Sequence, residues 1–449
     1  METTDQAPAK SRRTGPLVSS TGQVLVRPVT FQFALDPTVD QRVLFAKSAG
    51  ARRVAFNHHV GRVKENLDRR EREKDLPYGP RLPGLSWSAI SFINEMNAWK
   101  NGQLDSSPQN DDGTRGLHWR HEIPSDVFEC ASVDAAQALA NWSDSKRGTR
   151  KGVPVGFPRF AAKGRVTPSF RLRNRANPGE TQSIRFTDPT HLRLPKIGEV
   201  KVFGPTRRVR RMIGLGRFHI HSATITLRGG RWICSLNGVA AKFHHERRRP
   251  KDRHATTVGI DRGITALAVC ADAQGQLLAV FEGVNELRHA HEQLVRAQKT
   301  LARATPGSKG RSRAKSRLNK LHRRVANQRR HHAHQVSSWV MKNCGSVVLE
   351  DLNVAGMVKN HHLARAISDA AMGEVGRQIH YKAPWYGVNV TVADRFFASS
   401  KICSGCGAKK DRLDLSTRVY ACEHCDLVID RDHNAGVNLA RWTPALVST

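Results

Sequence analysis

Four cysteines near the C-terminal end of the sequence form two CxxC pairs. Cys403 and Cys406 make the first pair, and after fifteen intervening residues Cys422 and Cys425 make the second. Thiolates at this spacing are typical of a zinc ribbon, in which two tight turns bring four sulfur atoms around one tetrahedral Zn²⁺. We therefore expect these cysteines to hold a structural zinc ion, in a reducing compartment such as the cytoplasm.

Three acidic residues stand where predicted elements end or begin. Asp261 ends a compact apolar strand, Glu350 ends a later strand, and Asp432 lies at the start of the last helix. Carboxylates that converge repel one another, so a convergent set indicates bound cations. Two Mg²⁺ ions about 4 Å apart can bridge such oxygens, activate a water and stabilise both reacting oxygens in phosphodiester hydrolysis. The set predicts a nuclease site with catalytic Mg²⁺.

Each acid has a simpler interpretation when it is taken alone. Asp261 precedes Gly263 in a potential turn, and Glu350 could cap a helix. Asp430 competes with Asp432 for the third position. We prefer Asp432 because it adjoins the start of the last helix, and we expect Asp430 to cap that helix or to support Asp432. The order of the elements, more than any single acid, favours a shared site.

The elements that must position these acids follow a definite order. Five strands are predicted, at residues 255–260, 265–271, 277–281, 346–349 and 388–393. A helical segment is predicted around residues 363–381. This order resembles an RNase H-like core. In that architecture, acids at the ends of the first and fourth strands and on a late helix can converge on one point.

Composition indicates a polyanionic partner. The 449 residues include 73 Lys and Arg against 39 Asp and Glu, a formal net charge of +34. Nucleic acid neutralises such an excess by releasing counterions, which gives tight and salt-sensitive binding. A membrane is a weaker partner, because no apolar run approaches the ~20 residues that a span requires, and residues 1–8 lack the features of a secretory signal. The remaining cysteines are isolated and are predicted to be buried free thiols: Cys130, Cys234, Cys270 and Cys344.

The N-terminal half divides into a helical part and a strand-rich part. After a tail at residues 1–22, residues 24–35 predict one strand. Helices are predicted at residues 39–67, 87–99 and 128–142. Further strands are predicted at residues 169–173, 182–186, 191–194, 200–203, 219–227 and 232–236. Arginines alternate with apolar residues in these strands, so we expect a barrel or sandwich whose outer face offers guanidinium groups to phosphate.

A long basic insertion separates the third and fourth strands of the core. Two antiparallel helices are predicted between residues 285 and 343, and no acidic residue occurs between Glu292 and Glu350. Ten basic residues crowd the second helix: Lys309, Arg311, Arg313, Lys315, Arg317, Lys320, Arg323, Arg324, Arg329 and Arg330. We expect this helix to bind the backbone of a nucleic-acid heteroduplex, which is recognised by its shape and charge.

Four segments together resemble the TnpB family and its small type V CRISPR effector relatives. They are residues 258–263, 348–353, 399–407 and 430–435. Residues 35–57 resemble the family's N-terminal entry more loosely, and residues 70–250 match only in general layout. Members of this family are RNA-guided DNA nucleases. The resemblance therefore implies a guide RNA as partner and cleavage of double-stranded target DNA beside a short flanking motif.

The resemblance also implies an α/β multidomain fold, with an RNase H-like (RuvC-like) nuclease core, an inserted zinc ribbon, a wedge-type β-barrel and a helical recognition lobe. By position it gives the catalytic role to Asp261, Glu350 and Asp432, and the zinc to the four paired cysteines.

The resemblance also implies domain boundaries. The N-terminal part would comprise a disordered tail at 1–22, the wedge barrel at 23–36 and 151–254, and the recognition lobe at 37–150. The nuclease core would occupy 255–398 and 429–449, with the basic insertion at 285–343, and the zinc ribbon, a target-nucleic-acid-binding module, would occupy 399–428. Two departures, Asp426 for the frequent Gly and Gly436 for the usual Ala, remove neither a zinc ligand nor an acid.

Two other functions stay open at the level of sequence. A guide-directed DNA-binding protein that represses without cutting would share the basic surfaces, although the retained acids favour an enzyme. An unguided transposase or junction nuclease would share the core but would purify without a discrete RNA. The sequence sets no oligomeric state.

Overall fold

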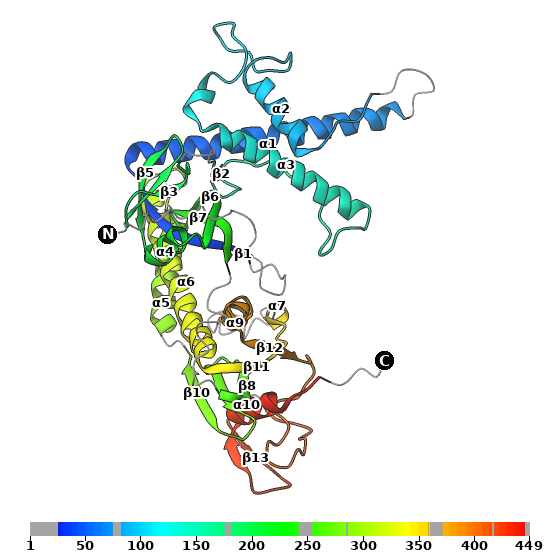
Figure 1. Cartoon of the computed structure of the whole chain (residues 1–449), viewed down its shortest axis with the longest axis vertical. Helices are drawn as coiled ribbons and strands as arrows, with labels where there is room; N and C mark the ends of the chain where they lie inside the picture. Colours follow the sequence, from blue (N-terminus) through cyan, green and yellow to red (C-terminus); the bar gives the residue numbers. More distant parts are fainter. Residues whose placement is uncertain are drawn as a thin grey trace, which may run out of the picture. The chain divides into compact units, whose positions relative to one another are not determined.

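The computed structural model describes residues 26–74, 82–175, 181–241, 254–283, 286–357, 359, 371–414 and 417–444. The tail predicted at residues 1–22 lies outside these ranges. The chain divides into two compact units, an N-terminal unit (Met1–Ala241) and a C-terminal unit (Lys242–Thr449), and each is described by itself. Figure 1 labels the elements of both units.

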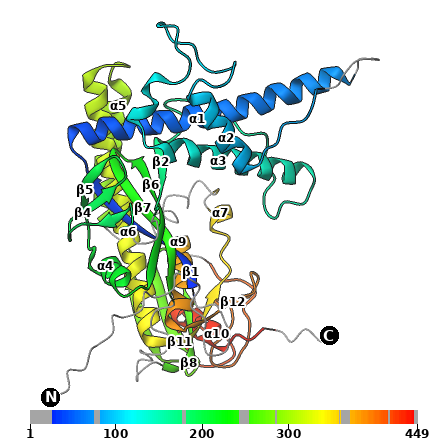
Figure 2. The same cartoon turned by 45° about the horizontal axis from the view of Figure 1, so that its top comes forward.

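The helical part of the N-terminal unit contains α1 (Val39–Glu73), α2 (Ala89–Lys100), the 3-10 helix η1 (His118–Glu122) and α3 (Ser125–Lys146). Helix α1 begins where the sequence predicts, because Thr38 and Gln41 form a capping box. The Gln41 amide donates to Thr38 Oγ1 at 3.3 Å, and the Thr38 amide donates to Gln41 Oε1 at 3.1 Å. Val63, Phe92 and Leu139 pack together from α1, α2 and α3. The three helices gather in one group (Figure 2).

The strands of the N-terminal unit form one seven-stranded antiparallel sheet in the described residues, in the order β2-β6-β7-β1-β5-β4-β3. They are β1 (Val26–Asp36), β2 (Ser169–Arg173), β3 (Arg185–Phe186), β4 (His191–Leu194), β5 (Gly198–Phe203), β6 (Phe218–Arg228) and β7 (Arg231–Ala241). Strand β1 precedes the helices in sequence but lies inside the sheet, between β7 and β5. Closure of this sheet into a barrel stays a prediction, because β2 and β3 stand at its edges.

The arginines of β2 differ from the expectation. Arg171 forms an ion pair with Asp134, and Arg173 Nη2 lies 3.1 Å from Glu129 Oε2, and both acids belong to α3. These guanidinium groups therefore attach α3 to the sheet. The prediction that they are offered to phosphate is wrong for these two residues, because helix α3 supplies carboxylates that the strand pattern alone does not reveal.

Two further elements depart from the sequence pattern. The strand predicted around Ile184 shortens to β3, because the Ile184 amide donates to the side chain of Asn174 at 2.8 Å. Helix α4 (Arg207–Gly214) was not predicted. Four of its eight residues are arginines, so its short apolar stripe is not evident in the sequence. Val209 and Met212 of this stripe are buried.

The C-terminal unit is built on a five-stranded mixed sheet in the order β10-β9-β8-β11-β12. Its strands are β8 (His254–Asp261), β9 (Ala266–Asp272), β10 (Leu277–Glu282), β11 (Cys344–Glu350) and β12 (Asn389–Ala393). Strands β8, β9 and β10 form an antiparallel meander. Strand β11 runs parallel to β8, and β12 runs parallel to β11. This order agrees with the one expected from the sequence.

The helices of this unit are α5 (Glu286–Arg303), α6 (Lys309–Asn343), α7 (Val354–Met357), α9 (Met372–Tyr386) and α10 (Arg431–Arg441). Of these, α6, α9 and α10 pack on the sheet. On one face, Val336 and Val340 of α6 and Ile379 of α9 share a core with Ile260 and Leu349 of the strands. The other face packs on α10, which Figure 1 shows in red beside β8. Of the helix predicted around residues 363–381, residues 363–370 lie outside the described ranges.

The isolated cysteines are all buried, as predicted: Cys130, Cys234, Cys270 and Cys344. Burial raises the pKa of the Cys234 thiol to about 12, so this group stays protonated and unreactive at neutral pH. No helix within the described ranges combines the length and the apolar character that a membrane crossing requires.

Candidate functional site

Strand alternation carries Asp261 and Glu350 to the same face of the C-terminal sheet. Ile260 pairs with Leu349 in the parallel register of β8 and β11. Both of these side chains enter the core under α6 and α9. The next residue on each strand points the opposite way. Asp261 and Glu350 therefore end two neighbouring strands on the face that α10 covers.

Two glycines allow α10 to approach this face closely. A Cβ atom on Gly259 would lie 1.9 Å from the backbone oxygen of Gly436 and 2.4 Å from the nitrogen of Ala440. A Cβ atom on Gly436 would lie 3.2 Å from the Cβ of Ala271 in β9. The glycine at position 436 thus makes room for the methyl group of Ala271. This close packing places the first turn of α10 near the end of β8.

Asp432 lies in that first turn of α10. Asp430 caps the helix, as expected, because its Oδ1 accepts the backbone amides of Asp432 at 3.0 Å and of the following residue at 2.9 Å. The Arg431 guanidinium donates to Asp432 Oδ1 at 3.1 and 3.3 Å. A Cβ atom on Gly263 would lie 4.0 Å from Asp432 Oδ2. Asp432 therefore reaches the turn that follows Asp261.

The three acids influence one another electrostatically. Burial raises the pKa of Asp261 well above its usual value, and the charges of Glu350 and Asp432 raise this pKa further, while Arg431 and Arg262 oppose the shift. The structure thus brings the three predicted acids to one place, where each is half-buried.

The spacing of the carboxylates bears on the number of ions they could hold. The oxygens of Asp261, Glu350 and Asp432 do not form a set in which all lie within 4.8 Å of one another. Two cations about 4 Å apart accept oxygens that are more widely spaced than those around one ion. Oxygen ligands alone, without nitrogen or sulfur, suit Mg²⁺ or Mn²⁺. The arrangement in this structure therefore does not gather all three acids around one ion.

Residues around the acids fix their geometry and were missed in the sequence. Ser399 Oγ donates to Glu350 Oε1 at 2.5 Å. Asn438 Nδ2 donates to the backbone oxygen of Ser399 at 2.8 Å, and the Ser404 amide donates to Asn434 Oδ1 at 2.9 Å. Asn434 and Asn438 are four residues apart in α10 and therefore lie on one face of the helix. This spacing is the signal that could have identified them.

Replacing Asp261 with asparagine is expected to stabilise the metal-free protein. At neutral pH the folded state bears the cost of a carboxylate whose pKa is raised by burial and like charges, and the unfolded state does not. Asparagine keeps the shape and removes the charge, so Tm should rise by roughly 2–4 °C, which corresponds to ~1 kcal/mol in a unit of this size. The gain should shrink as the pH falls through the raised pKa of Asp261 and should vanish well below ~4, where the carboxyl is protonated in both states.

Calorimetry of the zinc-loaded protein in buffer without Mg²⁺ or Mn²⁺ measures this gain. The exposed Asp394 offers the matched variant Asp394→Asn, which should leave Tm unchanged. A Tm for Asp261→Asn that equals or falls below that of the parent protein at pH 7 would contradict the crowding of the three acids.

The four paired cysteines form the second predicted site. Cys403 Sγ lies 3.6 Å from Cys425 Sγ, and Cys406 Sγ lies 3.6 Å from Cys422 Sγ. All four sulfur atoms lie within 4.8 Å of one another. A tetrahedral Zn²⁺ with bonds of about 2.3 Å requires sulfur atoms about 3.8 Å apart, so the spacing fits this ion. The His424 amide donates to Cys422 Sγ at 3.4 Å, and such a contact favours the thiolate.

The cysteine cluster and the acids are joined by a short stretch of chain. Strands β13 (Val419–Ala421) and β14 (Val428–Asp430) form a two-stranded sheet, and β13 directly precedes Cys422. Strand β14 ends at Asp430, the residue that caps α10. Correct folding of the cluster therefore bears directly on the position of Asp432.

The basic residues predicted on α6 fall into two groups. Seven are exposed: Lys309, Arg313, Lys315, Arg317, Lys320, Arg324 and Arg330. Arg311, Arg323 and Arg329 are half-buried. Arg311 Nη1 donates to the backbone oxygens of Leu301 at 3.1 Å and Ala304 at 2.8 Å, and so closes the C-terminal end of α5. Arg311 thus has a structural role, whereas the seven exposed residues are free to face solvent.

A second cluster of metal-ligand types lies among the helices of the N-terminal unit. Atoms of His58, His59 and Glu95 all lie within 4.8 Å of one another. His58 Nε2 lies 2.9 Å from Glu95 Oε1, which also pairs with Arg62, and His59 Nε2 lies 2.9 Å from Ser132 Oγ. Burial lowers the pKa of His59 to about 4. Because Arg62 already neutralises the carboxylate, we interpret this cluster as a polar network that holds α1, α2 and α3 together.

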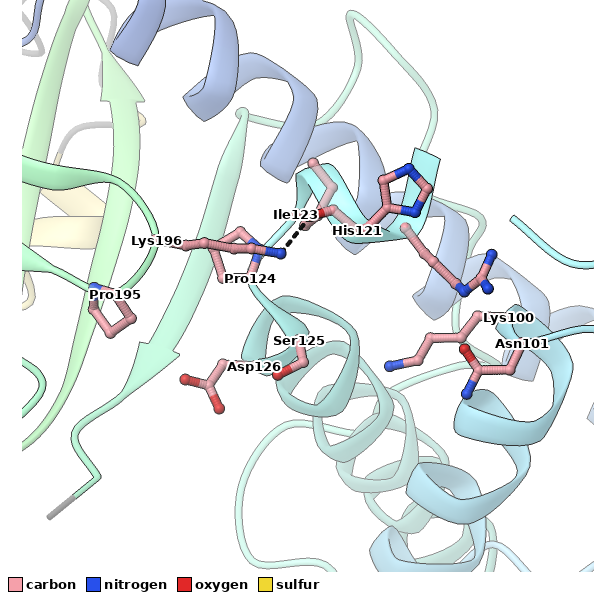
Figure 3. Close-up of a pocket in the computed structure, with 10 residues that line it drawn as sticks. Lys100, Asn101, His121, Ile123, Pro124, Ser125, Asp126, Pro195 and Lys196 are labelled. Carbon is pink, nitrogen blue, oxygen red and sulfur yellow. Dashed lines mark hydrogen bonds between the residues drawn. The ribbon is translucent and has the colours of Figure 1, made fainter. Parts of the chain in front are cut away.

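A cavity of about 460 Å³ lies in the same unit beside the start of α3. Its lining includes Lys100, Arg120 and Lys196. Figure 3 shows Lys196 donating to the backbone of His121. Desolvation by burial lowers the pKa of Lys100. Asp126 also lines the cavity, but Arg175 Nη2 lies 2.7 Å from its Oδ1. The cavity therefore has a positive character that suits an anion.

Comparison with known families identifies three matching segments. Residues 241–361 match the IS605 OrfB family described as "Probable transposase", and residues 373–439 match a family described as "Cas12f1-like, TNB domain". Residues 29–72 match an IS605 OrfB "Helix-turn-helix domain". In the structure this last segment consists of β1 and one continuous helix, α1.

Curated relatives extend the similarity over nearly the whole chain. A protein of Mycobacterium tuberculosis (strain CDC 1551) named "Putative RNA-guided DNA endonuclease" is 32% identical over 421 residues, which cover 92% of this chain and 86% of the relative. This chain belongs to the TnpB family. A relative of the same name from Streptomyces pristinaespiralis is 35% identical over 321 residues, which cover 70% of this TnpB-family chain and 72% of the relative.

Among solved structures, the chain is similar to the protein in "Cryo-EM structure of the Cas12f1-sgRNA-target DNA complex". The identity is 12%, the TM-score is 0.47, and the similarity covers 93% of this TnpB-family chain and 99% of the other.

Proposed function

We propose that this TnpB-family chain is an RNA-guided DNA endonuclease that cuts double-stranded DNA beside a short flanking motif by metal-dependent phosphodiester hydrolysis. The observation that carries the proposal is the gathering of Asp261, Glu350 and Asp432 on one face of the C-terminal sheet, where both neighbouring acids raise the pKa of Asp261. The name of the M. tuberculosis relative supports the same activity for this chain.

In this proposal the C-terminal unit is a RuvC-like nuclease. Asp261, Glu350 and Asp432 would hold two Mg²⁺ ions, which supply an activated water and stabilise the charge that develops on the phosphate. Ser399 holds the Glu350 carboxylate in one orientation through its hydrogen bond of 2.5 Å. Arg431 neutralises part of the charge on Asp432 and keeps this side chain over the turn after β8. Cys403, Cys406, Cys422 and Cys425 would hold the structural Zn²⁺.

The remaining parts would bind nucleic acid. We propose that the N-terminal sheet is the wedge domain, that α1, α2 and α3 form the recognition lobe, and that both bind the guide RNA. The cavity lined by Lys100, Arg120 and Lys196 offers cations to an RNA phosphate. The exposed basic face of α6 would follow the backbone of the guide–target heteroduplex, whose sequence is read by base pairing.

The exposed arginines of α6 provide a quantitative test of this last role. The triple variant Arg313→Ala, Arg317→Ala and Arg324→Ala should weaken binding to any nucleic-acid sequence alike. The slope of log K against log salt concentration should fall by about 0.7–0.9 for each phosphate contact that is lost. Fluorescence anisotropy at several salt concentrations measures both effects.

The matched control replaces the same three arginines with lysine, which keeps the charges and should keep most of the salt slope. An alanine variant with an unchanged salt slope would show that α6 binds no backbone phosphate.

One preparation tests the proposed function against its two alternatives. The protein should copurify with a discrete RNA, and sequencing of this RNA identifies the guide segment. The complex should then cut DNA that matches the guide when Mg²⁺ is present. Binding of matched DNA without cutting would instead support a guide-directed repressor. Cutting of branched DNA by protein free of RNA would support an unguided transposase or junction nuclease.

A further inference from the structure

One aromatic side chain beside the candidate acids has no packing partner that explains its position. Phe396 is 94% exposed, whereas its neighbour Phe397 packs against Val348, Ala393 and Leu439. Single exposed apolar residues are common on protein surfaces and carry no meaning by themselves. The position and the fixed geometry of this one give it significance.

The loop that carries Phe396 is attached to the acid-bearing strand on both sides. Before the loop, Ala393 pairs with Glu350 in the register of β12 and β11. Within it, Arg395 donates two hydrogen bonds to Asp351 Oδ2, at 2.7 and 3.0 Å. After it, Ser399 donates to the carboxylate of Glu350. The ring is therefore presented to solvent from a fixed loop next to one of the three candidate acids.

The exposed ring suits an unpaired base better than a protein partner, and the two arginines near the acids are each paired with a carboxylate. Arg395 is half exposed in its ion pair with Asp351, and Arg418 Nη1 lies 4.0 Å from Asp432 Oδ2. An exposed aromatic face stacks on an unpaired base, so the ring itself carries the inference. A protein partner is a poorer explanation, because a specific protein interface buries about 1,200 Å² or more and a single ring supplies a small part of that area.

We propose that Phe396 stacks on an unpaired base of the DNA strand that is being cut, and so fixes the scissile phosphate over Asp261, Glu350 and Asp432. Phe396 is then a positioning residue for single-stranded DNA. This inference rests on the proposed nuclease function. The stacked nucleotide must be unpaired, because a base face is accessible to a ring only outside a duplex.

Loss of the ring should weaken the productive position of the strand. Phe396→Ala is expected to lower kcat/KM for guide-matched DNA about 5- to 150-fold, the range given by base–aromatic stacking, mainly through kcat, because pairing with the guide keeps the target bound. Phe396→Trp should retain the activity of the parent protein, because its larger ring also stacks. The Tm of both variants should be unchanged, since the ring is exposed.

Abasic substrates distinguish stacking from a structural role. A single abasic nucleotide is moved along the cleaved strand, and the guide-bound protein is assayed with each substrate. At one position the missing base should slow the parent protein 5- to 150-fold and should slow Phe396→Ala no further. Phe160→Ala, which removes a half-exposed phenylalanine in the other unit, is the matched control and should lose activity at this position as the parent does.

Two results would overturn the inference. In the first, Phe396→Ala cuts every substrate as fast as the parent protein. In the second, the abasic nucleotide slows Phe396→Ala by the same factor as it slows the parent protein, at every position tested. A parent protein that cuts no substrate would overturn the proposed nuclease function itself, which is a separate outcome.

Discussion

Replacing Asp261 with alanine is expected to lower the rate of DNA cleavage by about 10³-fold or more while target binding persists. The carboxylate of Asp261 lies at the end of β8, where Glu350 and Asp432 act on it. Its loss would remove a ligand of the metal ions, which contribute several kcal/mol of charge stabilisation, and each 1.36 kcal/mol corresponds to about tenfold in rate. Glu350→Ala should have a similar effect. Single-turnover cleavage and a gel-shift assay with the same complex measure the two quantities separately.

A neighbouring acid provides the control for this prediction. Asp351 follows Glu350 directly, but its carboxylate is exposed and pairs with Arg395. Because asparagine keeps an oxygen that accepts from Arg395 and so holds the Phe396 loop, Asp351→Asn should reduce cleavage by less than tenfold, well short of the ~10³-fold effect of losing a metal ligand. Equal losses of binding and cleavage in Asp261→Ala, or a larger effect of Asp351→Asn, would refute the assignment of the catalytic acids.

Replacing Cys422 with serine is expected to remove the zinc ion and, with it, most of the cleavage activity. Structural zinc contributes folding free energy, about 10–16 kcal/mol in isolated zinc-finger peptides, and serine is a poor ligand for it. Because β14 runs directly from the cysteine cluster to the cap of α10, loss of the cluster should displace Asp432. A displacement of about 1 Å can cost on the order of 10²-fold in rate. Elemental analysis should fall from about one zinc per chain to nearly none.

The matched control uses a cysteine outside the cluster. Cys234 is buried in β7 of the other unit, and Cys234→Ala should retain the full zinc content. Wild-type protein without zinc would show that the cluster has been misinterpreted. Full cleavage by a zinc-free Cys422→Ser protein would show that the position of Asp432 does not depend on the ribbon.

The sequence was sufficient to predict the elements whose signals are local. The apolar runs that end in Asp261 and Glu350 became β8 and β11, and strand alternation is enough to place both acids on one face. The spacing of the CxxC pairs predicted a cluster whose sulfur atoms do lie together. Asp430 was expected as a cap and accepts two amide hydrogens of α10.

Features that depend on contacts between distant segments were not predictable in this way. The close approach of Gly259 to Gly436 joins residues 177 positions apart, and neither glycine lies in a turn that would signal its role. The structural role of Arg311, whose guanidinium group binds carbonyl oxygens at the C-terminal end of α5, could not be distinguished in the sequence from the roles of the other nine basic residues of α6. The roles of Ser399 and Phe396 depend on the pairing of β12 with β11, which brings their loop to Glu350, and this pairing is not encoded by residues near either position in the sequence.

The most direct test of the central claim is a structure of the guide- and target-bound protein crystallised with Mn²⁺, with metals located by their anomalous scattering. We expect two manganese ions about 4 Å apart, coordinated by the carboxylates at positions 261, 350 and 432, and a zinc ion among the four cysteine sulfurs. A zinc-loaded ribbon together with three acids that remain too far apart to share any manganese ion would contradict the account.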